Sequence, residues 1–283
     1  MTGRFARGAA VTALLVLGPA LAAPGVAEAP GSARDGAGAS QTASQKYGWG
    51  KSLWDFAYQY GESLSDPPHR GTDRKHGSWT ESTDGSGRAV KWGGGLQIES
   101  SGQRRGDPGD HGTASLTLHD QPETYGRWET RHRSDAIESS DQPYRDLIQL
   151  VPAGGGCDHT ITIADLDPNG ETVTIAVNAG GQSWKRTFKG YEQGRDFPRN
   201  YGVEVTKKKI SWFIDGKVVG TLTDKAAIPK DPMTVRLSLA GEGSTERNHT
   251  TLLFDWVRGW DLAKGKNPPK GPAVKAGSYD DAC

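Results

Sequence analysis

The sequence predicts an all-β protein, built as a two-sheet antiparallel sandwich. Short segments alternate apolar and polar residues, turn residues separate them, and long amphipathic helical runs are lacking. The clearest stretch is Tyr201–Leu222, in which Val203 and Val205 alternate with polar residues. Asp215 and Gly216 then form the strongest short hairpin signal, because both turn positions need a positive φ angle. This stretch predicts three consecutive strands.

Length and charge narrow the class of protein. The 283 residues suit one β-sandwich together with its terminal segments. Lysine and arginine together number 34, as do aspartate and glutamate, so no basic excess favours nucleic acid or an anionic membrane. We therefore expect a neutral partner and no nucleic acid. We also expect no membrane span, no cofactor and a monomeric protein.

The first 22 residues have the pattern of a Sec-type signal peptide. Arg4 and Arg7 precede an apolar run at 9–17 that is too short to span a bilayer, and Ala20-Leu21-Ala22 is a small-x-small cleavage site. Cleavage after about Ala22 would give a secreted, extracellular protein. Residues 23–46 are rich in Ala, Gly, Ser and Pro and predict a flexible leader.

One domain is expected between residues 47 and 262. Trp49–Gly61 is a candidate first strand, and short alternating strands follow at Trp79–Ser82 and Leu96–Glu99. Residues 263–283 are rich in Lys, Pro and Gly and predict a flexible C-terminal tail.

Five segments, in order, resemble glycoside hydrolase family 16, the laminarinase and lichenase group. They read YGRWETRHR (125–133), YRDLIQLVPAGGG (144–156), YGVEVTKKKISWFIDGK (201–217), VRLSLAGEG (235–243) and FDWVRGW (254–260). The resemblance implies a concanavalin A-like jelly roll that binds a polysaccharide in a concave cleft.

The chain departs from that family where the family has its catalytic motif, Glu-x-Asp-x-Glu or Glu-x-Asp-x-x-Glu. The corresponding stretch is HTITIADLD (159–167), with Thr160 at the nucleophile position, Thr162 at the central Asp position and Asp165 at the acid/base position of the longer motif. Threonine cannot replace a carboxylate nucleophile here. The resemblance implies substrate contacts for Thr160, Thr162, Tyr144 and Gln149, the last of which replaces a cleft aromatic residue.

Alternation along this strand gives a separate prediction. Ile161 and Ile163 should enter the core, which leaves Thr160, Thr162 and Ala164 on the cleft face. Asp165 would then point toward the core, unless a β-bulge shifts the phase and turns it into the cleft. The alternative is a strand-end aspartate that caps a turn.

The remaining signals concern metals and cysteines. Asp165–Gly170 matches the first half of a calcium loop, but Ala176 stands where a bidentate Glu belongs, and the histidines lack metal-binding spacing. A turn is therefore favoured and no metal site is expected. In an exported chain, the two cysteines predict a Cys157–Cys283 disulfide that pins the tail near the Gly-rich loop at the cleft rim. The alternatives are that Cys283 pairs between molecules or stays free.

Two functions fit these observations. The first is a protein that binds a neutral polysaccharide or cell-wall glycan, with weak or no hydrolysis. The alternative is an active glycoside hydrolase or polysaccharide lyase that uses relocated carboxylates such as Asp165, Asp146 or Glu129. The two differ in whether two carboxyl groups converge in the cleft.

Overall fold

The computed structural model describes residues 40–58, 69–70, 78–92, 94–100, 112–119, 121–137, 142–168, 170–241 and 247–283. The predicted signal peptide and residues 23–39 of the predicted leader lie outside this part of the chain. The helices within it are too short to cross a bilayer.

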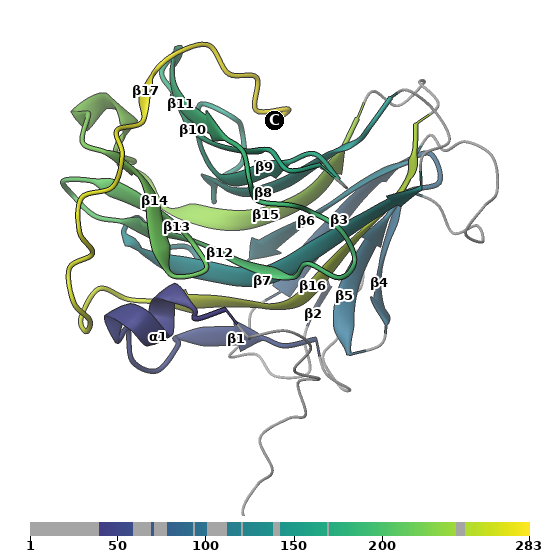
Figure 1. Ribbon diagram of the computed structural model, residues 1–283, viewed down its shortest axis with the longest axis horizontal. Helices are drawn as coiled ribbons and strands as arrows, with labels where there is room; N and C mark the ends of the chain where they lie inside the picture. The colour runs from purple at the N-terminus through teal and green to yellow at the C-terminus, as the bar shows by residue number, and fades with distance from the viewer. Residues whose placement is uncertain are drawn as a thin grey trace, which may run out of the picture. The chain divides into compact units, whose positions relative to one another are not determined.

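Residues 40–283 contain two antiparallel sheets, one stacked on the other, as the sequence predicts (Figure 1). Sheet A runs in the order β14 (Lys217–Leu222), β13 (Ile210–Ile214), β12 (Arg199–Val205), β7 (Gly126–Ile137), β16 (His249–Trp260), β5 (Gly95–Glu99) and β4 (Arg88–Trp92), and β1 (Trp54–Phe56) also pairs with β16. Sheet B runs in the order β17 (Lys275–Ala276), β11 (Gln182–Phe188), β10 (Val173–Ala179), β9 (His159–Leu166), β8 (Arg145–Pro152), β15 (Met233–Ala240), β6 (Thr113–His119), β3 (Ser78–Asp84) and β2 (His69–Arg70). Two short helical segments, α1 (Ala43–Tyr47) and the 3₁₀ turn η2 (Lys225–Ala227), complete the described elements.

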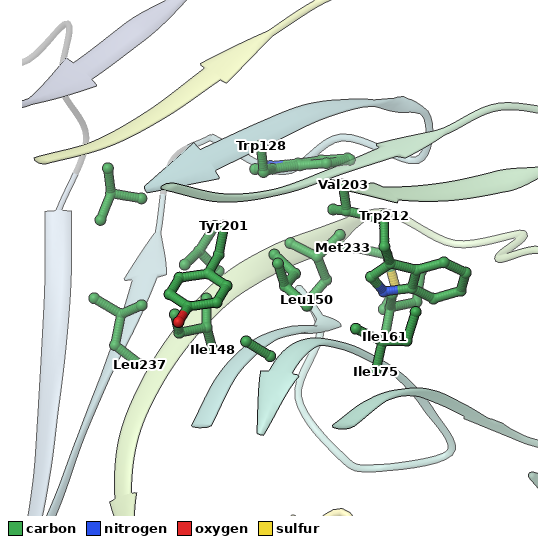
Figure 2. Packing of buried hydrophobic residues seen from close by; sticks show 14 of the residues in the cluster. Trp128, Ile148, Leu150, Ile161, Ile175, Tyr201, Val203, Trp212, Met233 and Leu237 are labelled. Atoms are coloured by element: carbon green, nitrogen blue, oxygen red, sulfur yellow. The ribbon is translucent and has the colours of Figure 1, made fainter. Parts of the chain in front are cut away.

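The main hydrophobic core lies between the two sheets. Trp128, Tyr201 and Val203 of sheet A face Ile148 and Leu150 of sheet B, and all five side chains are buried (Figure 2). Alternate residues of each strand contribute to this layer, as expected for a sandwich. The apolar face of each sheet is therefore covered by the other, which leaves the opposite face of sheet B for other contacts.

The three strands predicted from Tyr201–Leu222 are present as β12, β13 and β14. The turn between β13 and β14 has φ angles of 49° at Asp215 and 67° at Gly216. Both angles are positive, which is the conformation that an Asp-Gly hairpin turn requires. The local sequence therefore determines this hairpin.

The segment before Tyr47 differs from the predicted flexible leader. Helix α1 has a capping box formed by Thr42 and Gln45, and Ala43 is completely buried. The backbone N–H groups of Ala43 and Ser44 donate to the carboxylate of Glu129 on β7, at 2.5 and 3.2 Å. Residues 40–46 are therefore held against sheet A by contacts that the composition of the segment does not reveal.

The C-terminal segment also differs from the predicted flexible tail. Strand β17 pairs with β11 at the edge of sheet B, and the chain then continues across the sheet to Cys283 (Figure 1). Cys283 forms a disulfide with Cys157, which lies in the loop between β8 and β9. The predicted disulfide is therefore present, and the tail lies against the sheet.

Candidate functional site on the outer face of sheet B

The register of β8 and β9 determines which residues reach the outer face of sheet B. Gln149 pairs with Thr162 and Ile148 pairs with Ala164, so Ile163 is an extra residue without a partner on β8. The β9–β10 ladder shifts at the same place. This β-bulge reverses the inside-outside alternation for the residues that follow it.

The bulge corrects one prediction and decides another. Ala164, expected on the cleft face, belongs instead to the hydrophobic core, because the extra residue Ile163 turns it inward. The next residue, Asp165, is turned outward by the same shift. Thr160, Thr162 and Asp165 therefore share the outer face of β9.

Asp165 has two polar partners on this face. The Arg145 guanidinium donates to its carboxylate, with Nη2 2.8 Å from Oδ2, and the hydroxyl of Tyr279 donates to the same oxygen at 3.1 Å. The Tyr279 pKa is raised, first because its ring is buried and second because the Asp165 carboxylate is adjacent. Tyr279 is therefore a neutral hydrogen-bond donor at physiological pH.

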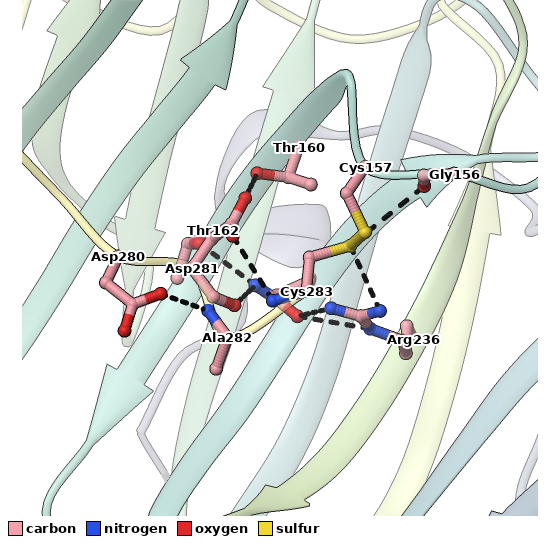
Figure 3. The surroundings of a disulfide bond; sticks show 10 residues. Gly156, Cys157, Thr160, Thr162, Arg236, Asp280, Asp281, Ala282 and Cys283 are labelled. Atoms are coloured by element: carbon pink, nitrogen blue, oxygen red, sulfur yellow. Dashed lines mark hydrogen bonds between the residues drawn. A yellow bond between two sulfur atoms is a disulfide. The ribbon is translucent and has the colours of Figure 1, made fainter. Parts of the chain in front are cut away.

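Thr160 contacts Asp281 of the C-terminal segment (Figure 3), and Gln149 contacts the same residue. The Thr160 hydroxyl donates to the carboxylate of Asp281 at 2.5 Å, and Gln149 Nε2 donates to the Asp281 carbonyl at 2.9 Å. Gln149 Oε1 accepts a hydrogen bond from Arg236 Nη2 at 2.7 Å, and Gln149 Nε2 donates to the Thr162 hydroxyl at 3.4 Å. These four predicted site residues, including Asp165, thus lie close together on one face.

Tyr144, the remaining predicted substrate contact, lies elsewhere. Its ring is 1% exposed within the hydrophobic core, and the Arg247 guanidinium lies 5.6 Å from the ring centroid. A ring enclosed in this way presents no free face on which a sugar could stack. Its position just before β8 turns it into the core, so we assign no direct substrate contact to Tyr144.

The other two carboxylates considered for catalysis do not join Asp165. Asp146 points between the sheets, where its carboxylate lies 2.5 Å from His132 Nε2 and both side chains are fully buried. Glu129 belongs to sheet A and accepts hydrogen bonds from the start of α1. Burial raises the pKa of both carboxyl groups, to about 7 for Glu129. Of these three carboxylates, only Asp165 reaches the outer face of sheet B.

A groove of about 580 Å³ lies beside these residues on the same face. It crosses β3, β6, β8 and β15, and the C-terminal segment forms one wall. Its lining is mostly polar and comprises Ser82, Thr83, Asp84, Thr113, Ala114, Ser115, Pro143, Arg145, Arg236, Ser238, Leu239, Ala240, Gly241, Arg247, Asp280, Ala282 and Cys283. Hydroxyl, guanidinium and carboxylate groups in such a groove can hydrogen-bond to the hydroxyl groups of a sugar chain.

A metal centre was not expected from the sequence. In the part of the chain that the structure describes, no three His, Cys, Asp or Glu residues are grouped so that they could hold a metal ion. Asp165, which opens the sequence pattern of a calcium loop, is instead paired with Arg145.

Comparisons with known proteins relate part of the sequence, and the fold, to glycosyl hydrolases family 16. The family model matches residues 172–258, which run from β10 into β16. Among solved structures, the chain is similar to the catalytic domain of an endo-1,3-β-glucanase (laminarinase) from Thermotoga petrophila RKU-1, with 15% identity, a TM-score of 0.55, and coverage of 77% of this chain and 98% of the other. The endo-β-1,3-glucanase from Pyrococcus furiosus gives 15% identity, a TM-score of 0.56, and coverage of 76% and 95%. This chain has a glycoside hydrolase family 16-like fold.

The comparisons do not single out one sugar. A third similar structure is the GlcNAcα1-4Gal releasing endo-β-galactosidase from Clostridium perfringens, at 13% identity and a TM-score of 0.56, with coverage of 77% of this chain and 64% of the other. A search of curated proteins gave no match. Identities at this level establish the family 16-like fold alone, and fold alone does not determine the substrate.

The residues matched by the family model do not include β9, the strand on which this chain lacks the catalytic motif of the family. The match begins at residue 172, whereas Thr160, Thr162 and Asp165 lie on β9, which ends at Leu166. The matched segment supplies strands of both sheets, so it accounts for the shared fold. The outer face of β9 has to be interpreted from its own side chains.

Sequence reasoning missed the part that the tail plays in this site. Tyr279, Asp280 and Asp281 contact strand residues that are more than 100 positions away in the chain. The one signal for it was the cysteine pair, which predicted that the tail ends at the cleft rim. The path of the tail across β9 and β10 follows from side-chain contacts that have no periodic sequence signature.

Proposed function

We propose that this chain is a secreted protein that binds a neutral polysaccharide on the outer face of sheet B and hydrolyses it weakly or not at all. The observation that carries the proposal is the chemistry of β9, where Thr160 and Thr162 stand at the positions that the family resemblance assigns to the nucleophile and the central aspartate. Threonine hydroxyls cannot supply the acid pair that glycoside hydrolysis requires. The adjacent open groove supplies the polar groups that a sugar chain can contact.

A neutral ligand is favoured because carboxylates balance the arginines that line the groove. Asp84 and Asp280 line the same groove, and Arg145 pairs with the Asp165 carboxylate at 2.8 Å. The chain as a whole has a formal net charge of zero. Little uncompensated positive charge is therefore left to attract an acidic glycan.

Binding can be tested by affinity electrophoresis in gels that contain laminarin, lichenan or pectin. We expect retardation by a neutral β-glucan and none by the acidic pectin. Arg236→Ala should weaken binding by about tenfold, since a hydrogen bond to a charged group contributes about 1.5–3 kcal/mol. Arg133→Ala is the matched control, because Arg133 lies on sheet A near Asp255. Binding that is stronger to pectin, or equal losses in both variants, would contradict the proposal.

Secretion has its own test. If residues 1–22 act as a signal peptide, protein recovered from the culture medium of an expressing bacterium should begin at Ala23. Recovery of the full-length chain from the cytoplasm alone would contradict secretion.

The alternative function, an active glycoside hydrolase or lyase, is kept because the bulge at Ile163 turns Asp165 outward. The C-terminal segment also brings the Asp281 carboxylate to Thr160, the position of the family nucleophile. Reducing-sugar release from laminarin or lichenan would support this alternative if Asp165→Asn and Asp281→Asn each abolished it. Release equal to a blank without enzyme would support the binding function.

A further inference from the structure

The C-terminal segment Tyr279–Cys283, here called the cover, lies across β9, the strand that the resemblance to family 16 identifies with the catalytic strand. It leaves β17 at the sheet edge, passes over β10 and β9, and ends at the disulfide beside Gly156 (Figures 1 and 3). Both ends of this crossing are fixed, one by pairing with β11 and the other by a covalent bond.

The cover satisfies polar side chains on three neighbouring strands. Asn178 on β10 donates to the Tyr279 carbonyl at 3.2 Å, and Arg145 on β8 donates to the Asp280 carbonyl at 2.8 Å. Together with the contacts of Gln149, Thr160 and Asp165, these bonds occupy donors and acceptors that would otherwise face solvent. The cover thus binds to the same kinds of groups that would hold the hydroxyls of a sugar.

Burial shows how complete the coverage is. Thr160, Thr162 and Gln149 are each 0% exposed, although they lie on the outer face of the sheet. None of the three lines the open groove, which instead ends against Asp280, Ala282 and Cys283 of the cover. A sugar chain in the groove therefore cannot extend over β9 while the cover is in place.

We propose that the cover is an autoinhibitory segment, locked by the Cys157–Cys283 disulfide, that closes the β9 half of the polysaccharide-binding face. This inference rests on the proposed function. A tethered segment competes at a high effective concentration, so glycan affinity is reduced by the fraction of molecules in which the cover is open. Breaking the tether lowers that effective concentration and lets a longer stretch of polysaccharide bind.

Carboxyl footprinting tests, without a glycan, whether the disulfide holds the cover over β9. A carbodiimide and glycine ethyl ester convert accessible carboxylates to amides, and mass spectrometry measures the modification of each residue. In the wild type we expect Asp165 to be protected and Asp280, whose side chain is 87% exposed, to react. In Cys283→Ser and in Cys157→Ser, modification of Asp165 should rise at least about fivefold while Asp280 stays unchanged. Equal Asp165 modification in all three proteins would overturn the lock.

Reduction of the wild type provides the same test without a substitution. Dithiothreitol transfers two electrons and two protons to the disulfide, which becomes two thiols, and itself closes to a cyclic disulfide. The reduced protein should reproduce the footprint of Cys283→Ser. Asp281→Ala keeps the disulfide but removes the bond to Thr160, and we expect a smaller rise in Asp165 modification.

Glycan binding tests the autoinhibition. Using the β-glucan that the wild type binds in affinity electrophoresis, we expect an affinity at least about tenfold higher for Cys283→Ser and for the reduced wild type. Ser278→Ala, which alters an exposed side chain just before the cover and outside the groove, should leave affinity unchanged. Equal affinity with and without the disulfide would overturn autoinhibition while leaving the proposed function intact. If Asp165 becomes accessible but no protein binds any glycan, the polysaccharide function is overturned and the cover stands as a lock over Asp165.

Discussion

At the scale of single residues, Glu129 shows how burial changes a side chain. Its carboxylate is 1% exposed, and burial raises its pKa to about 7 although two backbone N–H groups of α1 donate to it. Between pH 4.5 and about 7, the folded state binds more protons than the unfolded state. The free energy of unfolding therefore falls as the pH rises through this window.

Replacement of Glu129 by Gln should remove this pH dependence. The amide cannot ionise, and its oxygen can still accept from Ala43 N. From pH 5 to pH 8, the wild type should lose on the order of 3 kcal/mol more stability than Glu129→Gln, because each pKa unit corresponds to about 1.4 kcal/mol. Urea unfolding at both pH values measures this difference. Glu171→Gln, at an exposed carboxylate, is the control, and a Glu129→Gln variant with the same pH dependence as the wild type would contradict the account.

At the scale of elements, the hairpin between β13 and β14 depends on the turn residue Gly216. Its φ angle is 67°, and an added Cβ would lie 2.8 Å from the Gln41 carbonyl oxygen. Gly180, in the turn between β10 and β11, has a φ angle of 56° but open space around the Cβ position. Substitution of Gly180 by alanine would therefore test backbone strain alone, whereas substitution of Gly216 would add steric overlap to that strain.

We expect Gly180→Ala to lower the free energy of unfolding by about 1 kcal/mol, through the left-handed backbone alone. Gly216→Ala should cost at least about 1 kcal/mol more, because the segment before α1 has to move. Chemical denaturation of both variants gives the comparison. Equal losses would show that residues 40–42 do not press on the turn.

The same elements show which features the sequence can predict. Strands β12 to β14 were predictable because alternation and an Asp-Gly turn act locally, and Thr160 and Thr162 followed from alternation along β9. Asp165 turns outward because of a β-bulge at Ile163. An isoleucine in an apolar strand looks the same in the sequence whether or not it forms a bulge, so the sequence leaves the orientation of Asp165 open. The composition of the tail predicts flexibility, because the contacts that hold the tail are long-range. The family resemblance predicts Tyr144 in the cleft, whereas its ring packs in the core.

At the scale of the whole molecule, the disulfide joins residues 126 positions apart. A crosslink across so long a loop removes many conformations from the unfolded chain. We expect the double variant Cys157→Ser/Cys283→Ser to lose about 2–5 kcal/mol in the free energy of unfolding. Urea titration of the oxidised wild type and the double variant measures the loss. A midpoint that does not change would show that the bond contributes only to the position of the tail.

We propose that the outer face of sheet B binds polysaccharide and leaves it intact. The most direct measurement is a crystal structure of the Cys283→Ser variant after several days with a β-1,3-linked glucan hexasaccharide. We predict an intact oligosaccharide along the groove near Ser115 and Arg236, extending over Thr160. A cleaved sugar between Asp165 and Asp281, or a sugar bound only away from sheet B, would contradict the claim.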